Sequence, residues 1–353
     1  MKKIVLLKWT FDNVDGGEKV AVNLANELAN YNDVYLVSLN SSKLPFYPVS
    51  DKVHYVNLGS GRKRIRDGFL SNIIKLRKFI ISNNIDIIFS IGVSTNLFML
   101  LSSIFLGVKT VFCEHTNTKF RAPGRIHLLQ RYLGAKYSTK IITLTKEDRE
   151  NYINEYGVPE DKVDCIYNWI DATVVNEVYD PSIKKILTVG RFTFQKGYDL
   201  LAIIASKIYH KYPDWVWDIY GDGSLEIKEK LKDIPNICLK GIVKGTENIF
   251  PGHSIYVMTS YFEGFPLVLL EAKQFKLPIV SFNCPTGPAE IIRNNENGFL
   301  VENYDVDLMF EQISKLIEDS EKRKIFSNNA MLDVDKFSKD EIIKVWLKLV
   351  EDL

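Results

Sequence analysis

The sequence lacks the cysteine pairs, the strong net charge and the long apolar runs that would assign a protein to an obvious structural class. Four cysteines occur in 353 residues, and no two of them form a Cys-x-x-Cys pair. This usage predicts a reducing compartment, without a disulfide framework or a zinc site. The formal net charge of +1 gives no overall field that would favour nucleic acid. The longest apolar run, residues 96–108, contains two serines and is too short to span a membrane.

Several catalytic signatures are also missing. The sequence contains no Gly-x-Ser-x-Gly elbow, no Walker-type loop and no Gly-x-Gly-x-x-Gly fingerprint, which argues against hydrolases and nucleotide triphosphatases. The histidines and cysteines lack metal-ligand spacing. Two Asp-x-Asp triplets, residues 305–307 and 333–335, lie at or between the expected C-terminal helices, so no metal site is expected. The N-terminal apolar run is too short for a signal peptide and predicts a first strand.

Short apolar runs alternate with helical patterns along a chain that is 46% hydrophobic and long enough for two domains. Strands are expected at residues 4–9, 34–39, 53–58, 86–91, 110–114, 140–144, 163–167, 185–189, 216–220, 237–240, 255–258, 279–282 and 299–301. Helices are expected at residues 19–29, 69–82, 95–106, 126–137, 146–156 and 198–209, from residue 267 onward, and at residues 305–319, 321–331 and 339–353. The alternation predicts an α/β fold with parallel, doubly wound sheets.

The pattern runs through the chain twice. A polar segment with a proline, residues 172–182, fits a linker, and the alternation restarts after it. We therefore expect two doubly wound domains, residues 1–175 and residues 176–338, with a cleft between them. The last helix, residues 339–353, carries an apolar stripe that must dock on another surface.

Two carboxylates occur around a break in the chain after the strand at residues 255–258. Gly264 and Pro266 precede an apolar helix, so Glu263 is expected in the loop and Glu271 inside the helix. Such carboxylates can bind different hydroxyls of one polyol, while free N–H groups at the helix start favour an anion. The alternative is a solvated helix face, but the apolar residues before Glu271 predict a mostly buried helix.

Three other loops at strand ends carry candidate residues. Arg191 and Lys196 lie beside glycines. Two fixed cations suit a diphosphate, whose negative charge grows when a glycosyl bond to it breaks. The alternative for either residue alone is an ordinary surface cation. Gly16 and Gly17 form either a phosphate-binding turn or only a tight turn. His115 ends a strand, where a functional role and a structural role are both open.

These motifs resemble the retaining glycosyltransferases of family 4, which have the GT-B fold. The similarity extends over essentially the whole chain, in the segments Gly16-Gly17-Glu18, Glu114-His115, Asn168 to Asp171, Gly190-Arg191, Lys196-Gly197, Gly221 to Gly223, and Glu263 with Glu271. The last two elements are the most specific. Trp169 is a departure, because Asn-Gly-Val-Asp is commoner in the family than Asn-Trp-Ile-Asp. Residues 281–292 resemble a subgroup that acts in bacterial polysaccharide or glycolipid assembly.

The resemblance implies roles for the matched positions. His115 would contact the transferred sugar, Glu263 its hydroxyls, and the cations Arg191 and Lys196 the diphosphate. Glu271 would hold the ribose hydroxyls. The other donor-binding residues would be Gly16, Gly17, Asn168, Gly190, Gly221, Phe265, Pro266, Leu267 and Val268. Neither a metal nor a cofactor is expected beyond the donor, a UDP-sugar. A donor phosphate oxygen would take the acceptor's proton, so no protein base is needed.

The function follows from the same resemblance. We expect a retaining, metal-independent hexosyltransferase that moves a hexose or N-acetylhexosamine to a glycan or lipid-linked acceptor in bacterial surface polysaccharide or glycolipid synthesis. Residues 1–175 would bind the acceptor, with helix 339–353 crossing back onto them, and residues 176–338 would bind the donor. The alternatives are a UDP-sugar epimerase on the same fold and a non-catalytic partner subunit.

The charge is uneven despite its balanced total. The stretch from His115 to Lys146 has no acidic residue and carries a basic cluster from Lys119 to Lys140, and a second basic cluster spans Arg62–Arg66. Because acceptors of the resembled family are often lipid-linked at the cytoplasmic leaflet, we expect a cytoplasmic protein. Peripheral contact of both clusters with anionic lipid on the inner face of the cytoplasmic membrane is a hypothesis, and ordinary solvated helix faces are the alternative.

Overall fold

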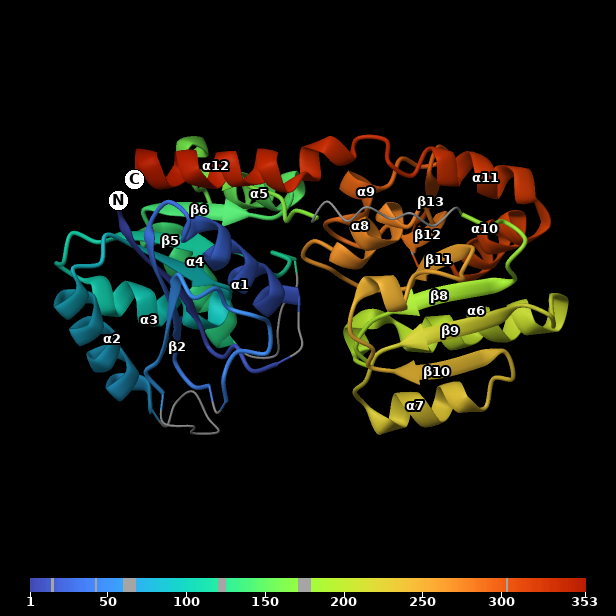
Figure 1. Cartoon of the computed structure of the whole chain (residues 1–353), viewed down its shortest axis with the longest axis horizontal. Helices are drawn as coiled ribbons and strands as arrows, with labels where there is room; N and C mark the ends of the chain where they lie inside the picture. Colours follow the sequence, from blue (N-terminus) through green and yellow to red (C-terminus); the bar gives the residue numbers. More distant parts are fainter. Residues whose placement is uncertain (14–15, 42, 60–67, 120–124, 171–178, 303) are drawn as a thin grey trace. The chain divides into compact units, whose positions relative to one another are not determined.

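The computed structural model describes residues 1–13, 16–41, 43–59, 68–119, 125–170, 179–302 and 304–353 (Figure 1). Its contacts divide the chain into two units, of which unit 1 is residues 1–169 with 339–353 and unit 2 is residues 170–338. The expected boundary at residue 175 and most of the expected linker lie outside the described residues. Each unit has one parallel sheet accompanied by helices, which confirms the predicted α/β doubly wound fold.

Unit 1 is built on a parallel sheet with the strand order β3-β2-β1-β4-β5-β6-β7. The strands are β1 (Lys3–Lys8), β2 (Asp33–Ser38), β3 (Val53–Asn57), β4 (Ile87–Ile91), β5 (Lys109–Cys113), β6 (Lys140–Thr143) and β7 (Val163–Cys165). The central strand β4 is buried at every position, because helices cover both faces of a parallel sheet. The winding reverses between β1 and β4, so the loops after these strands meet at one carboxyl edge.

The helices of unit 1 include the last helix of the chain. They are α1 (Gly16–Leu28), α2 (Phe69–Asn83), α3 (Val93–Ser103), α4 (Arg125–Tyr137), α5 (Lys146–Asn154) and α12 (Lys339–Asp352), with η2 (Glu160–Lys162) before β7. The ring of Trp346 in α12 lies 5.6 Å from that of Phe89 in β4. Nζ of Lys2 donates to the carbonyl oxygen of Val350 at 2.6 Å, so the two termini lie side by side (Figure 1). The apolar stripe of the final helix therefore docks on the N-terminal unit, as predicted.

Unit 2 has the strand order β10-β9-β8-β11-β12-β13. The strands are β8 (Lys185–Val189), β9 (Val216–Tyr220), β10 (Ile237–Gly241), β11 (Ile255–Met258), β12 (Ile279–Phe282) and β13 (Gly298–Val301). The helices are α6 (Tyr198–Lys211), α7 (Leu225–Lys232), α8 (Leu267–Gln274), α9 (Pro288–Ile291), α10 (Val306–Glu318) and α11 (Ser320–Asn328), with the short turns η3 (Phe194–Lys196), η4 (Thr246–Asn248) and η5 (Val334–Phe337). A separate apolar core fills this unit.

One local prediction was wrong, and two short helices were not predicted. Helix α1 begins at Gly16, three residues earlier than expected, so the two glycines lie in its first turn rather than in a loop. Glu18 allows this start because its carboxylate accepts the backbone N–H of Asn13 at 2.8 Å. Helices α7 and α9 were not predicted, because α7 buries only Leu231 and α9 has only four residues.

Candidate active site

The sheet of unit 2 reverses its winding between β8 and β11. β8 pairs with β9 on one side and with β11 on the other. The loops that follow β8 (residues 190–197) and β11 (residues 259–266) therefore leave neighbouring strands at the same carboxyl edge. Doubly wound sheets bind ligands at such a switch point. These two loops carry Arg191, Lys196 and Glu263, three of the four residues predicted as catalytic.

Lys196 and Glu263 form an ion pair across this edge. Nζ of Lys196 donates to Oε1 of Glu263 at 2.6 Å, and Nε2 of Gln195 donates to the second carboxylate oxygen at 3.4 Å. The side chains of Lys196 and Glu263 are 18% and 7% exposed. The hydroxyl of Thr286 donates to the carbonyl oxygen of Glu263 at 2.6 Å. Because water reaches neither charge freely, the pair holds one geometry more firmly than a surface ion pair does.

Two glycines let the loops approach each other backbone to backbone. A Cβ at Gly197, whose φ is +62°, would lie 2.0 Å from the carbonyl oxygen of Thr259. A Cβ at Gly221, whose φ is +150°, would lie 1.9 Å from the carbonyl oxygen of Gly190. No side chain fits at either distance, so the loops after β8, β9 and β11 can pack in this way only with glycine at both positions.

Arg191 is the second cation of this edge and differs from Lys196 in its surroundings. Its side chain is exposed, and no described residue bonds or pairs with its guanidinium. An exposed guanidinium has all five of its N–H donors available for a ligand. The edge thus offers one cation that the protein already pairs and one that it leaves open.

Helix α8 carries the second predicted carboxylate. It begins at Leu267, directly after Pro266, as expected from the sequence. Glu271 is half-buried within it. Burial raises the pKa of the Tyr256 hydroxyl, and the nearby Glu271 carboxylate raises it further. Because that hydroxyl lies 3.5 Å from the carbonyl oxygen of Val189 at the end of β8, Glu271 belongs to the same end of the sheet.

The remaining predicted donor-binding residues of unit 2 also gather at this edge. Gly190 follows β8, and Gly221 follows β9. Phe265 and Pro266 are buried ahead of α8, whereas Leu267 and Val268 are half-buried in its first turn. All the predicted site residues of unit 2 therefore come from one end of one sheet.

The predicted residues of unit 1 come from three of its elements. Gly16 and Gly17 open α1, which follows β1. His115 lies half-buried, two residues beyond the end of β5. Asn168 is buried beyond β7. The neighbouring Trp169, where the family more often has glycine, belongs to the apolar core of unit 1.

A buried polar network surrounds the loop that carries His115, and it was only partly predictable from the sequence. Glu114 is fully buried and pairs with Arg131, whose Nε lies 2.8 Å from Oε2. Burial would raise the pKa of Glu114, but the Arg131 charge and three hydrogen bonds hold it below its ordinary value. Asp148 lies in the neighbouring part of this network, in α5, and its pKa is raised to about 6, chiefly by burial. Arg131 was expected in a basic surface cluster; that prediction was wrong, because Glu114 draws the guanidinium into the core.

Sequence reasoning missed four polar residues that hold these loops: Gln195, Thr286, Asp148 and Tyr152. Gln195 lies beside Lys196, and Thr286 lies within residues 281–292, so these two matched segments were the available signal. Asp148 and Tyr152 belong to α5 and approach the His115 loop only through the fold. No local pattern marks them.

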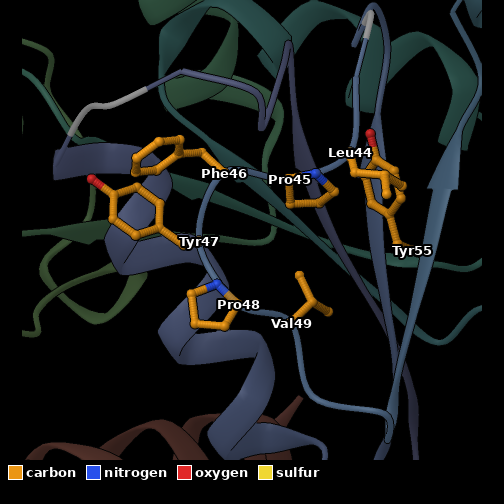
Figure 2. Close-up of a pocket in the computed structure, with 7 residues that line it drawn as sticks. All are labelled: Leu44, Pro45, Phe46, Tyr47, Pro48, Val49 and Tyr55. Atoms are coloured by element: carbon orange, nitrogen blue, oxygen red, sulfur yellow. The ribbon is translucent and has the colours of Figure 1, made fainter. Parts of the chain in front are cut away.

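Unit 1 also contains an apolar pocket of about 370 Å³, formed by the segment that connects β2 to β3 and by Tyr55 of β3 (Figure 2). Its lining is Leu44, Pro45, Phe46, Tyr47, Pro48, Val49 and Tyr55. The backbone N–H of Phe46 donates to the carbonyl oxygen of Phe11 at 2.8 Å, which ties the pocket to the loop after β1. No residue predicted for the active site lines this pocket. Within the described parts of the chain, no helix has the length and apolar character that crossing a lipid bilayer requires.

The two doubly wound parallel units, with candidate residues at strand carboxyl edges, define the GT-B class of glycosyltransferase folds. Solved structures share this architecture. TarM from S. aureus, in a crystal structure with Fondaparinux, alpha-GlcNAc-glycerol and UDP, superposes with a TM-score of 0.85 at 16% identity, covering 99% of both chains.

The sequence identifies the family. Residues 14–174 match Glycosyltransferase Family 4, and residues 177–333 match Glycosyl transferases group 1. The chain is 30% identical over 361 residues to the amylovoran biosynthesis glycosyltransferase AmsD of Erwinia amylovora, covering 98% of this chain and 99% of AmsD. It is 25% identical over 354 residues to an alpha-1,4-N-acetyl-D-galactosaminyltransferase of Campylobacter jejuni named for a PP-undecaprenol-linked glycan, covering 97% and 96%. The chain belongs to the family 4 glycosyltransferases.

Proposed function

We propose that this glycosyltransferase moves a sugar from a UDP-sugar, with retention, to a glycan or lipid-linked acceptor in bacterial surface polysaccharide or glycolipid synthesis. The observation that carries the proposal is the Lys196–Glu263 pair beside the open Arg191, at the switch point of unit 2. The relatives support the setting, since one is named for amylovoran biosynthesis and another for a PP-undecaprenol-linked glycan. TarM, with UDP in its crystal structure, supports the nucleotide.

Both partners of the ion pair keep hydrogen-bonding groups that a bound UDP-sugar can use. The Lys196 ammonium has three N–H donors and gives one to Glu263, so two remain for diphosphate oxygens. The Glu263 carboxylate can accept about four hydrogen bonds, so two sugar hydroxyls can still donate to it. Arg191 adds a guanidinium whose planar fork matches phosphate oxygens. We assign Glu271 to the ribose hydroxyls.

Each unit takes one part of the reaction in this proposal. Unit 2 binds the donor, and unit 1 binds the acceptor and contributes His115, Gly16, Gly17 and Asn168. During transfer the bond between the anomeric carbon and the diphosphate breaks while a bond to the acceptor oxygen forms on the same face. The acceptor's proton passes to a diphosphate oxygen, and UDP leaves. Cationic side chains offset the charge that develops on the leaving group, so we propose that no metal is required.

A thermal-shift panel with UDP, GDP, ADP and NAD tests the donor class. UDP at about 100 times its dissociation constant should add about 2.7 kcal/mol to the stability of the folded state. Lys196→Met should lose most of this shift, because it removes a cation without adding bulk. Lys230→Met in α7 is the matched control, because it breaks an ion pair of 2.8 Å that is exposed and away from the switch point. A wild type that responds to none of the four nucleotides would contradict the donor-site assignment.

Product analysis then separates transfer from the alternative reactions. Incubation with UDP-galactose and UDP-N-acetylhexosamines, with and without a lipid-linked acceptor, should give a glycoside only when the acceptor is present. NMR of the new glycosidic bond should show the anomeric configuration of the donor, and EDTA should leave the rate unchanged. An epimerised nucleotide sugar formed without acceptor would favour the epimerase. Wild-type inactivity on every donor would favour a non-catalytic subunit.

We also propose that unit 1 contacts an anionic membrane surface through α4. This helix exposes Ile126, Leu129 and Tyr132 on successive turns, each about half exposed to solvent. Nζ of Lys136 lies 6.0 Å and 5.4 Å from the ring centres of Tyr132 and Tyr137 on the same helix. The α4 sequence contains no acidic residue, and an apolar helix face with a lysine beside it suits insertion among anionic headgroups.

The described residues of the basic clusters contribute less positive charge to this contact than their number suggests. Lys119 pairs with Glu147 at 3.0 Å, and Lys140 pairs with Asp164 at 2.8 Å, so both charges are partly neutralised. Cluster Arg62–Arg66 lies outside the described residues. The apolar face of α4 therefore supports the membrane proposal more strongly than the basic clusters do.

Vesicle sedimentation tests this contact. Vesicles rich in phosphatidylglycerol should bind the wild type, and Leu129→Ser should bind several-fold more weakly, because α4 loses apolar area at the interface. Ile203→Ser in α6 is the matched control, since Ile203 is also 50% exposed but lies in unit 2. Equal binding to phosphatidylglycerol and phosphatidylcholine vesicles would overturn the electrostatic part, and unchanged binding of Leu129→Ser would overturn the role of α4.

A further inference from the structure

The carboxylate of Glu114 is enclosed by hydrogen-bond donors from three parts of unit 1. Oε2 accepts from Nε of Arg131 at 2.8 Å and from the hydroxyl of Tyr152 at 2.9 Å. Oε1 accepts from the backbone N–H of Thr116 at 3.0 Å and also from the Thr116 hydroxyl. The side chain is completely buried. A fully buried charge needs this degree of compensation to persist in the core.

Arg131 extends the network along the loop after β5. Its Nη1 donates to the carbonyl oxygen of Thr118 at 3.2 Å, and its Nη2 donates to that of Asn117 at 3.1 Å. Nη2 also donates to the hydroxyl oxygen of Thr116 at 3.2 Å. One guanidinium therefore fixes three consecutive residues of the loop. A lysine in the same place could not reproduce this planar fork.

A second carboxylate fixes the far end of the loop. Oδ1 of Asp148 accepts from the backbone N–H of Thr118 at 3.0 Å and from its hydroxyl at 2.6 Å. The amide of Asn151 donates to the same hydroxyl at 2.9 Å. Asp148 is itself placed by Thr145, the N-cap of α5, whose hydroxyl accepts the Asp148 N–H at 3.1 Å.

His115 lies between positions that this network holds. On one side, the backbone N–H of Glu114 donates to the carbonyl oxygen of Ile142 in β6 at 2.8 Å. On the other side, the N–H of Thr116 is bound by the Glu114 carboxylate. The backbone on both sides of His115 is thus fixed within two residues, on a loop that would otherwise be free to move at a strand end.

Stability alone is a poor reason for this arrangement. A buried ion pair is often no better for stability than apolar residues of the same volume, because desolvation opposes the attraction between the charges. Precise placement of one loop is a better reason, since a catalytic group must be held within about 0.5 Å of its productive position. The network converges on the loop of His115, the catalytic candidate of unit 1.

We propose that Arg131 and Tyr152 are positioning residues that act through Glu114 to fix the loop bearing His115 for sugar transfer. The inference rests on the proposed function, in which His115 contacts the transferred sugar. Arg131 fixes the loop backbone directly, and Tyr152 holds the carboxylate that Arg131 and Thr116 share. Neither residue touches the substrate.

Tyr152→Phe is the first test, because it removes one hydroxyl and keeps the ring that packs against Phe112 at 6.2 Å. UDP release is measured with whichever UDP-galactose or UDP-N-acetylhexosamine donor the wild type turns over fastest. The variant should lose about tenfold to a hundredfold in kcat with little change in the donor KM. Its Thr116 and Thr118 amides should exchange hydrogen faster. Tyr35→Phe is the matched control: it removes a hydroxyl bonded to Asp33 at 3.2 Å in β2 and should leave kcat unchanged.

Two further variants cover the cases in which Tyr152→Phe fails to fold or the proposed function is wrong. If Tyr152→Phe unfolds, Thr116→Val removes a donor to Glu114 from an exposed position and carries the same expectations. Unchanged kcat and unchanged amide exchange in the variant that folds would overturn the positioning role. His115→Ala separates this result from failure of the proposed function. If His115→Ala is inactive while Tyr152→Phe is fully active, the inference is wrong and the function stands; if His115→Ala is fully active, the assigned role of His115 is wrong, and the inference falls with it.

Discussion

Asp148 should make the stability of unit 1 depend on pH in the opposite direction from most acidic residues. Asp148 is 1% exposed, and its pKa is raised from 3.8 to about 6. Burial is the main cause and the Glu114 charge adds to it, whereas the hydrogen bonds from Thr118 act in the opposite direction. A raised folded-state pKa means that the native state binds the proton more tightly than the unfolded chain does. The associated stabilisation is therefore fully present below pH 3.8 and is lost as the pH rises through about 6.

The size of the effect follows from the two pKa values. Each pKa unit corresponds to about 1.36 kcal/mol, so the full difference is on the order of 3 kcal/mol. Between about pH 7.5 and about pH 5, the linkage relation gives about 1.4 kcal/mol, because pH 5 lies about one unit below the native pKa of about 6 and still above the unfolded pKa of 3.8. Asp148→Asn keeps an oxygen acceptor for Thr118 but cannot titrate. The wild type should therefore gain about 1.4 kcal/mol relative to Asp148→Asn when the pH falls over this interval.

Amide hydrogen exchange in β5 and β6 measures this difference at the site itself, because both strands lie in the core of unit 1. The free energy of opening is determined for the wild type and for Asp148→Asn at both pH values. Asp51→Asn, at an exposed turn, is the control, since water surrounds that carboxylate in both states. A gap between wild type and Asp148→Asn that stays constant, or that moves in favour of the variant at the lower pH, would refute the reasoning.

Two other predictions follow from packing. Gly221→Ala should abolish stabilisation by UDP, because its Cβ would lie 1.9 Å from the carbonyl oxygen of Gly190; Gly252→Ala, with positive φ but no atom within 4 Å of the added Cβ, should keep it, and equal responses would disprove the close-approach argument. Trp346→Ala should destabilise unit 1 by about 3–5 kcal/mol in urea unfolding, because a 4% exposed ring leaves its core. The exposed neighbour variant Val345→Ala should cost less than about 1 kcal/mol, and similar losses in both would show that α12 is only loosely docked.

Much of the fold could be predicted from the sequence because its signals are local. Apolar runs of three to six residues bounded by turn residues predicted every strand in the described part of the chain, with ends shifted by no more than two residues. The α8 start was predictable from Gly264 and Pro266, since these residues break one element and suit the beginning of the next. The docking of α12 was predictable in part, because an apolar stripe in water requires a partner surface.

The candidate residues of unit 2 were also identified from the sequence. Each follows a predicted strand or opens a predicted helix, and parallel strands place their carboxyl ends at one edge. Their mutual contacts were not predictable. Lys196 and Glu263 are 67 positions apart and meet only because β8 and β11 are neighbours in the sheet. Strand order depends on packing across the whole unit, and no local pattern encodes it.

Arg131 shows most clearly where sequence and tertiary structure divide. Its sequence neighbourhood is basic and predicted a charged surface, whereas the folded chain buries it against Glu114, 17 residues away. The sequence by itself determined the alternation of strands and helices and the loops that carry candidate chemistry, because apolar period and chain-breaking residues act over a few residues. Only the tertiary structure decided which charges meet, since a buried charge is stable solely where distant elements supply its partners.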